Sequence, residues 1–263
     1  MARFGVAATA PFGADVLERL ASRHEIAFVL TRPDSQQGRG RKVAPPPTKV
    51  VAERLGLPVL QPERLDAAVE LPADTIVAVA YGLLVPTVLL DRHLWLNVHP
   101  SLLPRWRGAA PIERAIMAGD AETGVSIIRL VEALDAGPIG AQERFAIGPE
   151  DDAGVVYERA AETAARLLDP LPERFEPQPG EGATYAEKIG PDDRRLDLSR
   201  PAEELVRHVR ALSPHIGARA ELEGRPVTVW RARVAAEGSF EPLEVQPQGG
   251  RRMEYAAWVR GLR

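Results

Sequence analysis

The chain has 263 residues, of which 45% are hydrophobic and 27% charged, and these proportions suit a globular protein with one large domain or one domain and a smaller one. It contains no cysteine, which excludes disulfides, thiolate catalysis and cysteine-ligated metals. The net charge of −4 argues against a general nucleic-acid binder. No apolar run approaches the roughly 20 residues that span a bilayer, so we expect a cytoplasmic protein without membrane contact.

Strand and helix patterns alternate through the first 170 residues. Apolar runs predict strands at 4–8, 26–30, 59–60, 75–80, 94–98 and 125–130. Amphipathic spacing predicts helices at 13–22, 48–55, 110–118 and 152–168. This alternation is typical of an α/β fold with a doubly wound, mostly parallel, Rossmann-like sheet.

The pattern changes after residue 170, where prolines and glycines interrupt regular structure. A helix is predicted at 202–212, followed by strands at 218–222, 227–234 and 243–245. We therefore predict a first domain at 1–175, a linker at 176–195 and a small, mostly β domain at 196–263. The stretch 195–263 carries an excess of three positive charges, whereas the rest of the chain carries an excess of seven negative charges. A basic module on an acidic domain hints at a polyanionic partner.

Polar chemistry concentrates just after the predicted strand at 94–98. Asn97 and His99 alternate by two, so they project to the same side at the strand end, where ligands of parallel sheets bind. An amide and an imidazole side by side suit the stabilisation of an oxyanion and proton transfer at neutral pH. Asp135 supplies a carboxylate in a separate turn. Each residue taken alone also fits a structural role, as a buried histidine, a cap or a turn residue.

The segment Asn97–Pro111 resembles the signature of folate-dependent formyltransferases, and the string Ser-Leu-Leu-Pro-Arg-Trp-Arg-Gly-Ala-Ala-Pro-Ile at 101–112 is most similar to the members that formylate methionyl-tRNA. Further similar motifs lie at 31–34, 38–42, 58–63, 79–82, 118–125, 182–186 and 243–247. The resemblance implies that Asn97, His99 and Asp135 are the catalytic trio. It also implies a folate pocket lined by Val79, Ala80, Tyr81, Gly82, Leu83, Ser101, Leu102, Leu103, Pro104, Leu134 and Gly137.

The resemblance also implies a role for the loop at 32–42, which distinguishes the family members that formylate methionyl-tRNA from the other members. Arg32, Arg39, Arg41 and Lys42 make it cationic, and by resemblance they contact tRNA phosphates. The alternative interpretation of this loop is a solvated basic surface.

Two departures from the family accompany the resemblance. The turn after the first strand reads Ala-Thr-Ala-Pro-Phe-Gly at 8–13, where relatives usually have Gly-Thr-Pro-Glu-Phe-Ala. The second domain has only a few residues between Val234 and Leu243, so we expect an OB-like domain that is shortened and either open or closed differently.

The implied reaction transfers the formyl group of 10-formyltetrahydrofolate to the amino group of methionine on initiator tRNA. No metal is expected, because the acidic and histidine residues lack ligand spacing, and we expect a monomer. Alternatives are a formyltransferase acting on an amino sugar or other small amine, and a non-catalytic tRNA-binding relative. A dinucleotide-dependent oxidoreductase is disfavoured, because the first strand lacks the Gly-x-Gly-x-x-Gly motif.

Overall fold

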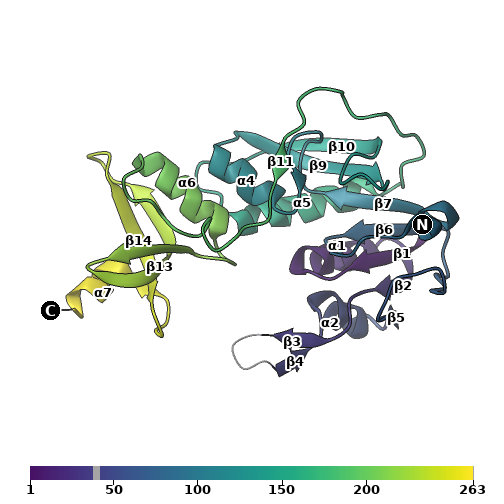
Figure 1. Cartoon of the computed structure of the whole chain (residues 1–263), viewed down its shortest axis with the longest axis horizontal. Helices are drawn as coiled ribbons and strands as arrows, with labels where there is room; N and C mark the ends of the chain where they lie inside the picture. Colours follow the sequence, from purple (N-terminus) through teal and green to yellow (C-terminus); the bar gives the residue numbers. More distant parts are fainter. Residues whose placement is uncertain (38–41, 263) are drawn as a thin grey trace. The chain divides into compact units, whose positions relative to one another are not determined.

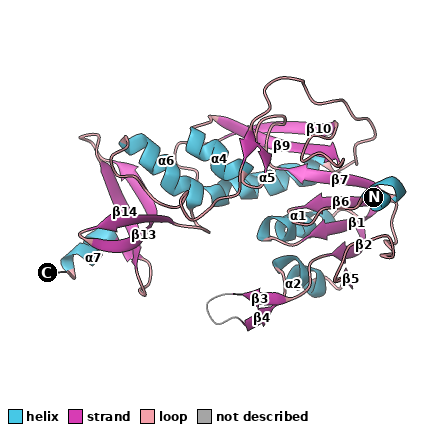
Figure 2. Ribbon diagram, viewed as in Figure 1, coloured by secondary structure: helices cyan, strands magenta, loops and turns pink. Residues whose placement is uncertain are grey.

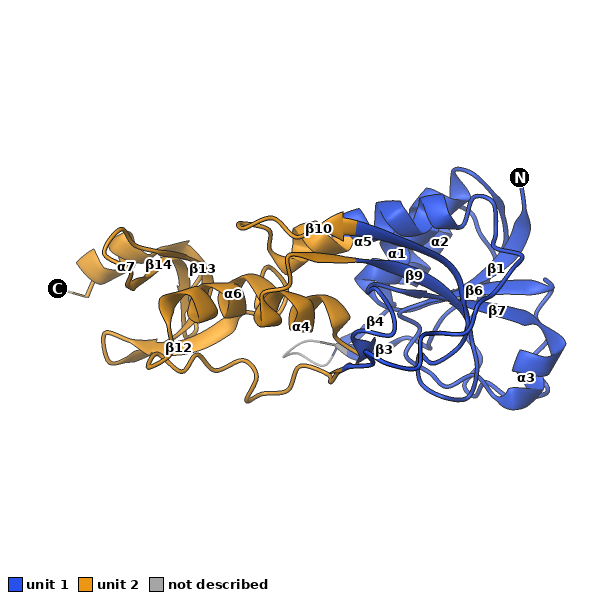
Figure 3. Cartoon of the chain, turned by 90° about the horizontal axis from the view of Figure 1, so that it is seen from above, with its two compact units in different colours: residues 1–107, 124–144, 158–184 blue, residues 108–123, 145–157, 185–263 orange. Residues whose placement is uncertain are grey.

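The computed structural model of the chain describes residues 1–37 and 42–262 (Figure 1). The chain forms two compact units, coloured blue and orange in Figure 3. The first comprises residues 1–107, 124–144 and 158–184, and the second comprises 108–123, 145–157 and 185–263. These units are built from several segments each. The predicted domain boundaries, with a linker at 176–195 between the two domains, stay a prediction.

A seven-stranded sheet forms the centre of the first unit, in the order β10-β9-β7-β6-β1-β2-β5. Its strands are β1 (Arg3–Ala8), β2 (Glu25–Leu30), β5 (Val59–Leu60), β6 (Thr75–Val79), β7 (Leu94–His99), β9 (Glu122–Arg129) and β10 (Ile139–Ala146). The pairs β1–β2, β1–β6, β2–β5 and β6–β7 are parallel, whereas β9 runs antiparallel to β7. The predicted α/β class with a mostly parallel sheet is thus confirmed.

Helices alternate with these strands (Figure 2). They are α1 (Pro11–Ala21), α2 (Pro47–Arg54), α3 (Thr87–Arg92) and α5 (Ala153–Leu167). Prolines open α1 and α2, where the missing N–H costs no helical hydrogen bond. Phe28, Ile76 and Trp95 are almost fully buried in a core cluster on the sheet. Among the described residues, no helix combines the length and apolar character that crossing a membrane requires.

Several short elements were not expected from the sequence. They are α3, β3 (Ser35–Gln37), β4 (Lys42–Ala44), β8 (Arg107–Gly108), β11 (Tyr185–Ala186), β15 (Met253–Glu254) and α7 (Tyr255–Arg260). These elements hold two to six residues each, too few to show a hydrophobic period. The longer strand β10 was also missed, because its residues Gln142, Glu143 and Arg144 carry no apolar run.

The second unit contains α4 (Pro111–Ala118) and α6 (Ala202–Leu212), which pack on each other. Its antiparallel sheet has the order β12-β13-β14-β15, with β12 at Ala218–Leu222, β13 at Arg225–Val234 and β14 at Phe240–Pro247. Leu205 and Val209 of α6 share a buried cluster with Val229, Val245 and Trp258. The expected small, mostly β second domain is confirmed. Within the described residues the strands follow one another in an open order, which accords with the shortened sequence.

A buried carboxyl at the start of α4 makes the stability of the second unit pH-dependent. The Tyr157 hydroxyl lies 3.2 Å from both carboxyl oxygens of Glu113, and burial raises the pKa of Glu113. The folded protein therefore holds this proton more tightly than the unfolded chain. The stabilisation is complete below the ordinary pKa of 4.5 and is lost as pH rises through the raised value.

We expect Glu113→Gln to flatten this pH dependence and to raise the free energy of unfolding at pH 8 by about 1 kcal/mol, because an amide needs no proton to stay neutral. Urea unfolding at pH 5 and pH 8 measures both effects. The exposed Glu158→Gln serves as the control and should follow the wild type. The same pH dependence in both variants would contradict the role given to Glu113.

Candidate active site

The carboxyl end of β7 presents two of the predicted catalytic residues. Asn97 pairs with Ile128 of β9, and His99 pairs with Ser126. The apolar residues around them hold the strand in the sheet, and His99 is only 3% exposed. Because side chains alternate along a strand, Asn97 and His99 emerge on one side.

Asp135 lies against both residues, so the structure brings the predicted trio together. Asn97 Nδ2 donates to Asp135 Oδ1 at 3.3 Å, and His99 Nδ1 lies 3.6 Å from Asp135 Oδ2. On the other side of the ring, His99 Nε2 donates to the main-chain oxygen of Trp106 at 2.8 Å. Both ring nitrogens thus face acceptor oxygens, which fixes the orientation of the ring between Asp135 and Trp106.

The turn that carries Asp135 has an unusual backbone. Asp135 adopts a φ of +48°, in the left-handed region that few non-glycine residues occupy. Gly137 follows, and a Cβ at this position would lie 1.8 Å from the oxygen of Arg129, so only glycine fits. The turn is therefore stabilised by hydrogen bonds from another segment of the chain. Gln178 supplies two of them, donating through Nε2 to the main-chain oxygens of Asp135 at 2.7 Å and Gly137 at 2.8 Å.

The loop after β7 is held by buried polar contacts. Ser101 Oγ donates to the oxygen of Arg105, and Ser126 Oγ donates to the oxygen of Ser101. Gln142 Nε2 donates to the oxygen of Leu103 and to Ser126 Oγ. Trp106 has a φ of +64°, and its N–H donates to Thr184 Oγ1 at 2.9 Å. These bonds fix the carbonyl of Trp106 at the position where His99 binds it.

The residues predicted to line a folate pocket fall into two groups. Exposed or half-buried positions are Ala80, Gly82, Leu83, Leu102, Pro104 and Leu134. Buried positions are Val79, Tyr81, Ser101, Leu103 and Gly137. The buried positions present little side-chain surface, and contact between folate and any of the eleven positions stays a prediction. Burial also raises the pKa of Tyr81 to about 12.

The loop after β6 and the loop that carries Leu134 are tied together. Thr87 Oγ1 donates to Glu132 Oε1 at 2.5 Å, which joins the start of α3 to the turn preceding Asp135. Leu83 and Leu134 are 40% and 63% exposed on these two loops. An apolar ligand surface at this edge of the sheet is therefore compatible with the structure, and the folate-contact assignment stays a prediction.

The described part of the basic loop forms a hairpin of β3 and β4, with Lys42 and Arg32 exposed. Arg39 and Arg41 lie outside the described residues. Asp34 accepts hydrogen bonds from Lys49 Nζ at 2.9 and 3.0 Å and from Gln61 Nε2 at 2.9 Å. These bonds, first that of Lys49, lower the pKa of Asp34. The hairpin base is thus anchored to α2 and to the segment after β5.

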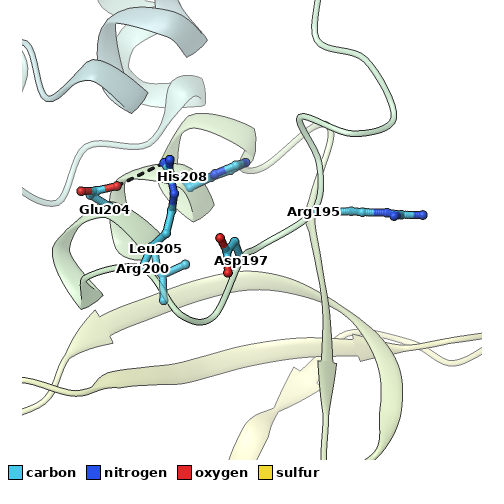
Figure 4. Close-up of a pocket in the computed structure, with 6 residues that line it drawn as sticks. All are labelled: Arg195, Asp197, Arg200, Glu204, Leu205 and His208. Atoms are coloured by element: carbon cyan, nitrogen blue, oxygen red, sulfur yellow. Dashed lines mark hydrogen bonds and ion pairs between the residues drawn. The ribbon is translucent and has the colours of Figure 1, made fainter.

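A cavity of about 290 Å³ in the second unit contains none of the predicted site residues. Figure 4 shows its lining residues Arg195, Asp197, Arg200, Glu204, Leu205 and His208. Arg200 pairs with Glu204 at 3.2 Å, and the side chain of Arg195 points away from the others. The opposite charges within this cavity compensate one another, so it offers no strong field for a charged ligand.

Sequence reasoning missed the residues that support the site, namely Gln178, Ser126, Gln142 and Thr184. Ser126 had a readable signal, because a hydroxyl within the buried run 123–128 must find a hydrogen-bond partner. Gln178 had none, since it lies between two prolines in a segment without periodicity.

Two family profiles match the chain: "Formyl transferase" covers residues 3–169, and "Formyl transferase, C-terminal domain" covers residues 188–242. A methionyl-tRNA formyltransferase of Paracoccus denitrificans is 44% identical over 97% of this chain and 95% of its own length. A protein of the same name from Dechloromonas aromatica is 40% identical over 97% of this chain and 94% of its own length.

Solved structures show the same fold at lower identity. A methionyl-tRNA formyltransferase from Clostridium thermocellum matches with a TM-score of 0.64 at 15% identity, covering 97% of this chain and all of that one (100%). An N-formyltransferase from Helicobacter canadensis, in complex with folinic acid and dTDP-3-aminofucose, matches with a TM-score of 0.65 at 15% identity, covering 89% of this chain and 88% of that one.

Proposed function

The chain belongs to the formyl transferase family, and on that premise we propose that it transfers the formyl group of 10-formyltetrahydrofolate to the amino group of methionine on initiator tRNA. The relatives named for this activity match almost the full length of the chain at 40 to 44% identity. The observation that carries the proposal is the meeting of Asn97, His99 and Asp135 at the end of β7.

Asn97 and His99 are proposed to stabilise the oxyanion that forms when the amine attacks the formyl carbon. An amide carries two N–H groups, so Asn97 can donate one to Asp135 and the other to the formyl oxygen. His99 Nδ1 lies 3.6 Å from Asp135 Oδ2, so a proton at this position lies beside the carboxylate and is proposed to be shared with the developing oxyanion. Donors placed in advance around the developing charge account for a large share of such catalysis.

Asp135 is proposed to orient the imidazolium and to help remove the proton that the attacking amine loses. Its carboxylate lies against both partners, and its side chain is 9% exposed. As the C–N bond to the folate breaks, the departing nitrogen takes up a proton, so the reaction releases tetrahydrofolate and the formylated amine. That the transfer proceeds without a metal stays a prediction.

Arg32, Arg39, Arg41 and Lys42 are proposed to bind the phosphates of the tRNA acceptor stem. The exposure of Arg32 and Lys42 and the anchored base of the hairpin support this assignment. The folate contacts inferred above, the cytoplasmic location and the monomeric state belong to the same proposal.

The direct test incubates the protein with 10-formyltetrahydrofolate and methionyl initiator tRNA and measures formyl-methionine. The same reaction with a nucleotide-linked amino sugar in place of tRNA is the comparison. We expect formylation of the tRNA alone. Formylation of the sugar alone would select the other substrate class, and folate and tRNA binding without any transfer would select a non-catalytic relative.

A further inference from the structure

Gln178 occupies a segment that the sequence marks as a linker, yet it is half-buried between two exposed prolines. Three contacts seat this segment beside the start of β10. A Cβ at Gly140 would lie only 2.6 Å from the Phe175 ring, so the ring packs directly against this glycine. Glu176 and Ile139 exchange two main-chain hydrogen bonds at 2.8 and 2.9 Å. Gln178 then reaches the turn at Asp135.

The amide of Gln178 is fully engaged in a single orientation. Its oxygen accepts from Arg107 Nε at 3.1 Å and Nη2 at 2.6 Å, and its nitrogen donates to the carbonyls of Asp135 and Gly137. Because a guanidinium only donates and a carbonyl only accepts, the amide cannot be reversed without losing all four bonds. Arg107 thereby aims the two N–H groups at the turn.

We propose that Gln178, oriented by Arg107, is a positioning residue that holds the Asp135 carboxylate against Asn97 and His99; this inference rests on the proposed function. One feature opposes the conformation of this turn, namely the positive φ of Asp135, and the absence of a side chain at Gly137 is what allows the turn to pack against Arg129. Gln178, which Arg107 holds in one orientation, donates two hydrogen bonds to the carbonyls of the turn, and these bonds offset the strain. Without them the turn relaxes and the carboxylate leaves its two partners.

The first test is kinetic. We expect Gln178→Met, which preserves length and removes every polar contact, to lower kcat by about 10- to 100-fold, since a displacement of about 1 Å in a catalytic group has effects of this size. The KM values for folate and tRNA should stay within about twofold, because the substrate contacts remain. Gln178→Glu keeps the acceptors for Arg107 but loses both donors to the turn, so it should lose as much rate as Gln178→Met.

A second test asks whether the effect passes through Asp135. In an Asp135→Asn background, Gln178→Met should cause little further loss of kcat, because the group it positions has already lost its carboxylate chemistry. Full additivity of the two losses would overturn the proposal. So would a Gln178→Glu variant with wild-type kcat, since it would show that the donors to the turn are unnecessary.

Hydrogen–deuterium exchange of residues 130–139 gives a readout independent of activity. We expect faster exchange in Gln178→Met and in Gln178→Glu. Gln246→Met is the matched control, because the Gln246 amide likewise accepts from a side-chain N–H, that of the Trp230 ring, and donates to a main-chain carbonyl, but it lies in the second unit. It should leave exchange and kcat unchanged. Wild-type protein without transfer activity would refute the proposed function, whereas unchanged exchange in both Gln178 variants would refute the positioning role.

Discussion

Replacing His99 with alanine should lower the rate of formyl transfer about 100-fold or more, and Asp135→Asn should do the same. His99→Ala removes an N–H donor from the developing oxyanion. Asp135→Asn keeps the shape of the carboxylate but removes its charge and its ability to accept a proton. Single-turnover kinetics with saturating folate and tRNA measures the chemical step directly.

His93→Ala and Asp74→Asn are matched controls at the opposite end of β7 and of its neighbour β6. His93 precedes β7 and its ring binds the main-chain oxygen of Ala73, whereas Asp74 precedes β6 and is exposed. Both control variants should retain a rate close to that of the wild type. Near-wild-type turnover in His99→Ala or in Asp135→Asn would remove that residue from the mechanism.

Neutralising the basic loop should produce the second-largest effect. We expect the triple change Arg39→Gln, Arg41→Gln and Lys42→Gln to raise the KM for tRNA by about 10- to 100-fold and to leave the KM for folate unchanged. Each lost phosphate contact should also reduce the slope of log KM against log salt concentration by about 1. Initial rates over a salt series measure both quantities.

A control variant with three substituted arginines elsewhere in the same unit separates the loss of tRNA contacts in the loop from the effect of the protein's net charge. Arg3, Arg23 and Arg54 are exposed arginines that pair with Glu25, Asp169 and Glu18. Changing all three to glutamine alters the net charge equally but removes no proposed tRNA contact. An equal rise in KM in both triple variants would show that the loop acts only through overall charge.

The sequence predicted the central elements because each follows a strong local pattern. The run Thr75–Ala80 became the buried strand β6, and the helix predicted at 202–212 spans the residues of α6. Asn97 and His99 were predictable as neighbours, because strand alternation and the binding edge of parallel sheets are general rules. Hydrophobic periodicity therefore predicts the main strands and helices, and the polar residues at the end of β7 predict the part of the site that lies on this strand.

The other half of the site depends on contacts between distant segments. The position of Asp135 depends on its left-handed backbone and on the close packing that only a glycine at 137 allows. It also depends on the hydrogen bond from Gln178, which lies more than 40 residues further along the chain. None of these has a periodic signature. Strand β10 was missed for a related reason, because Gln142, Glu143 and Arg144 at its centre interrupt the apolar run and none of its residues is fully buried. Its place in the sheet comes from its neighbour β9.

The division of the second unit into three separate stretches of sequence has a consequence for biosynthesis. Helix α4 packs on α6, which follows about 90 residues later, and Met117 of α4 belongs to the cluster around Leu205. A ribosome adds roughly 5–20 residues per second, so α4 waits several seconds for its partner after it leaves the exit tunnel. During that interval its apolar face is exposed on the nascent chain. We therefore expect chains released before α6 is complete to be the species that chaperones and proteases recognise.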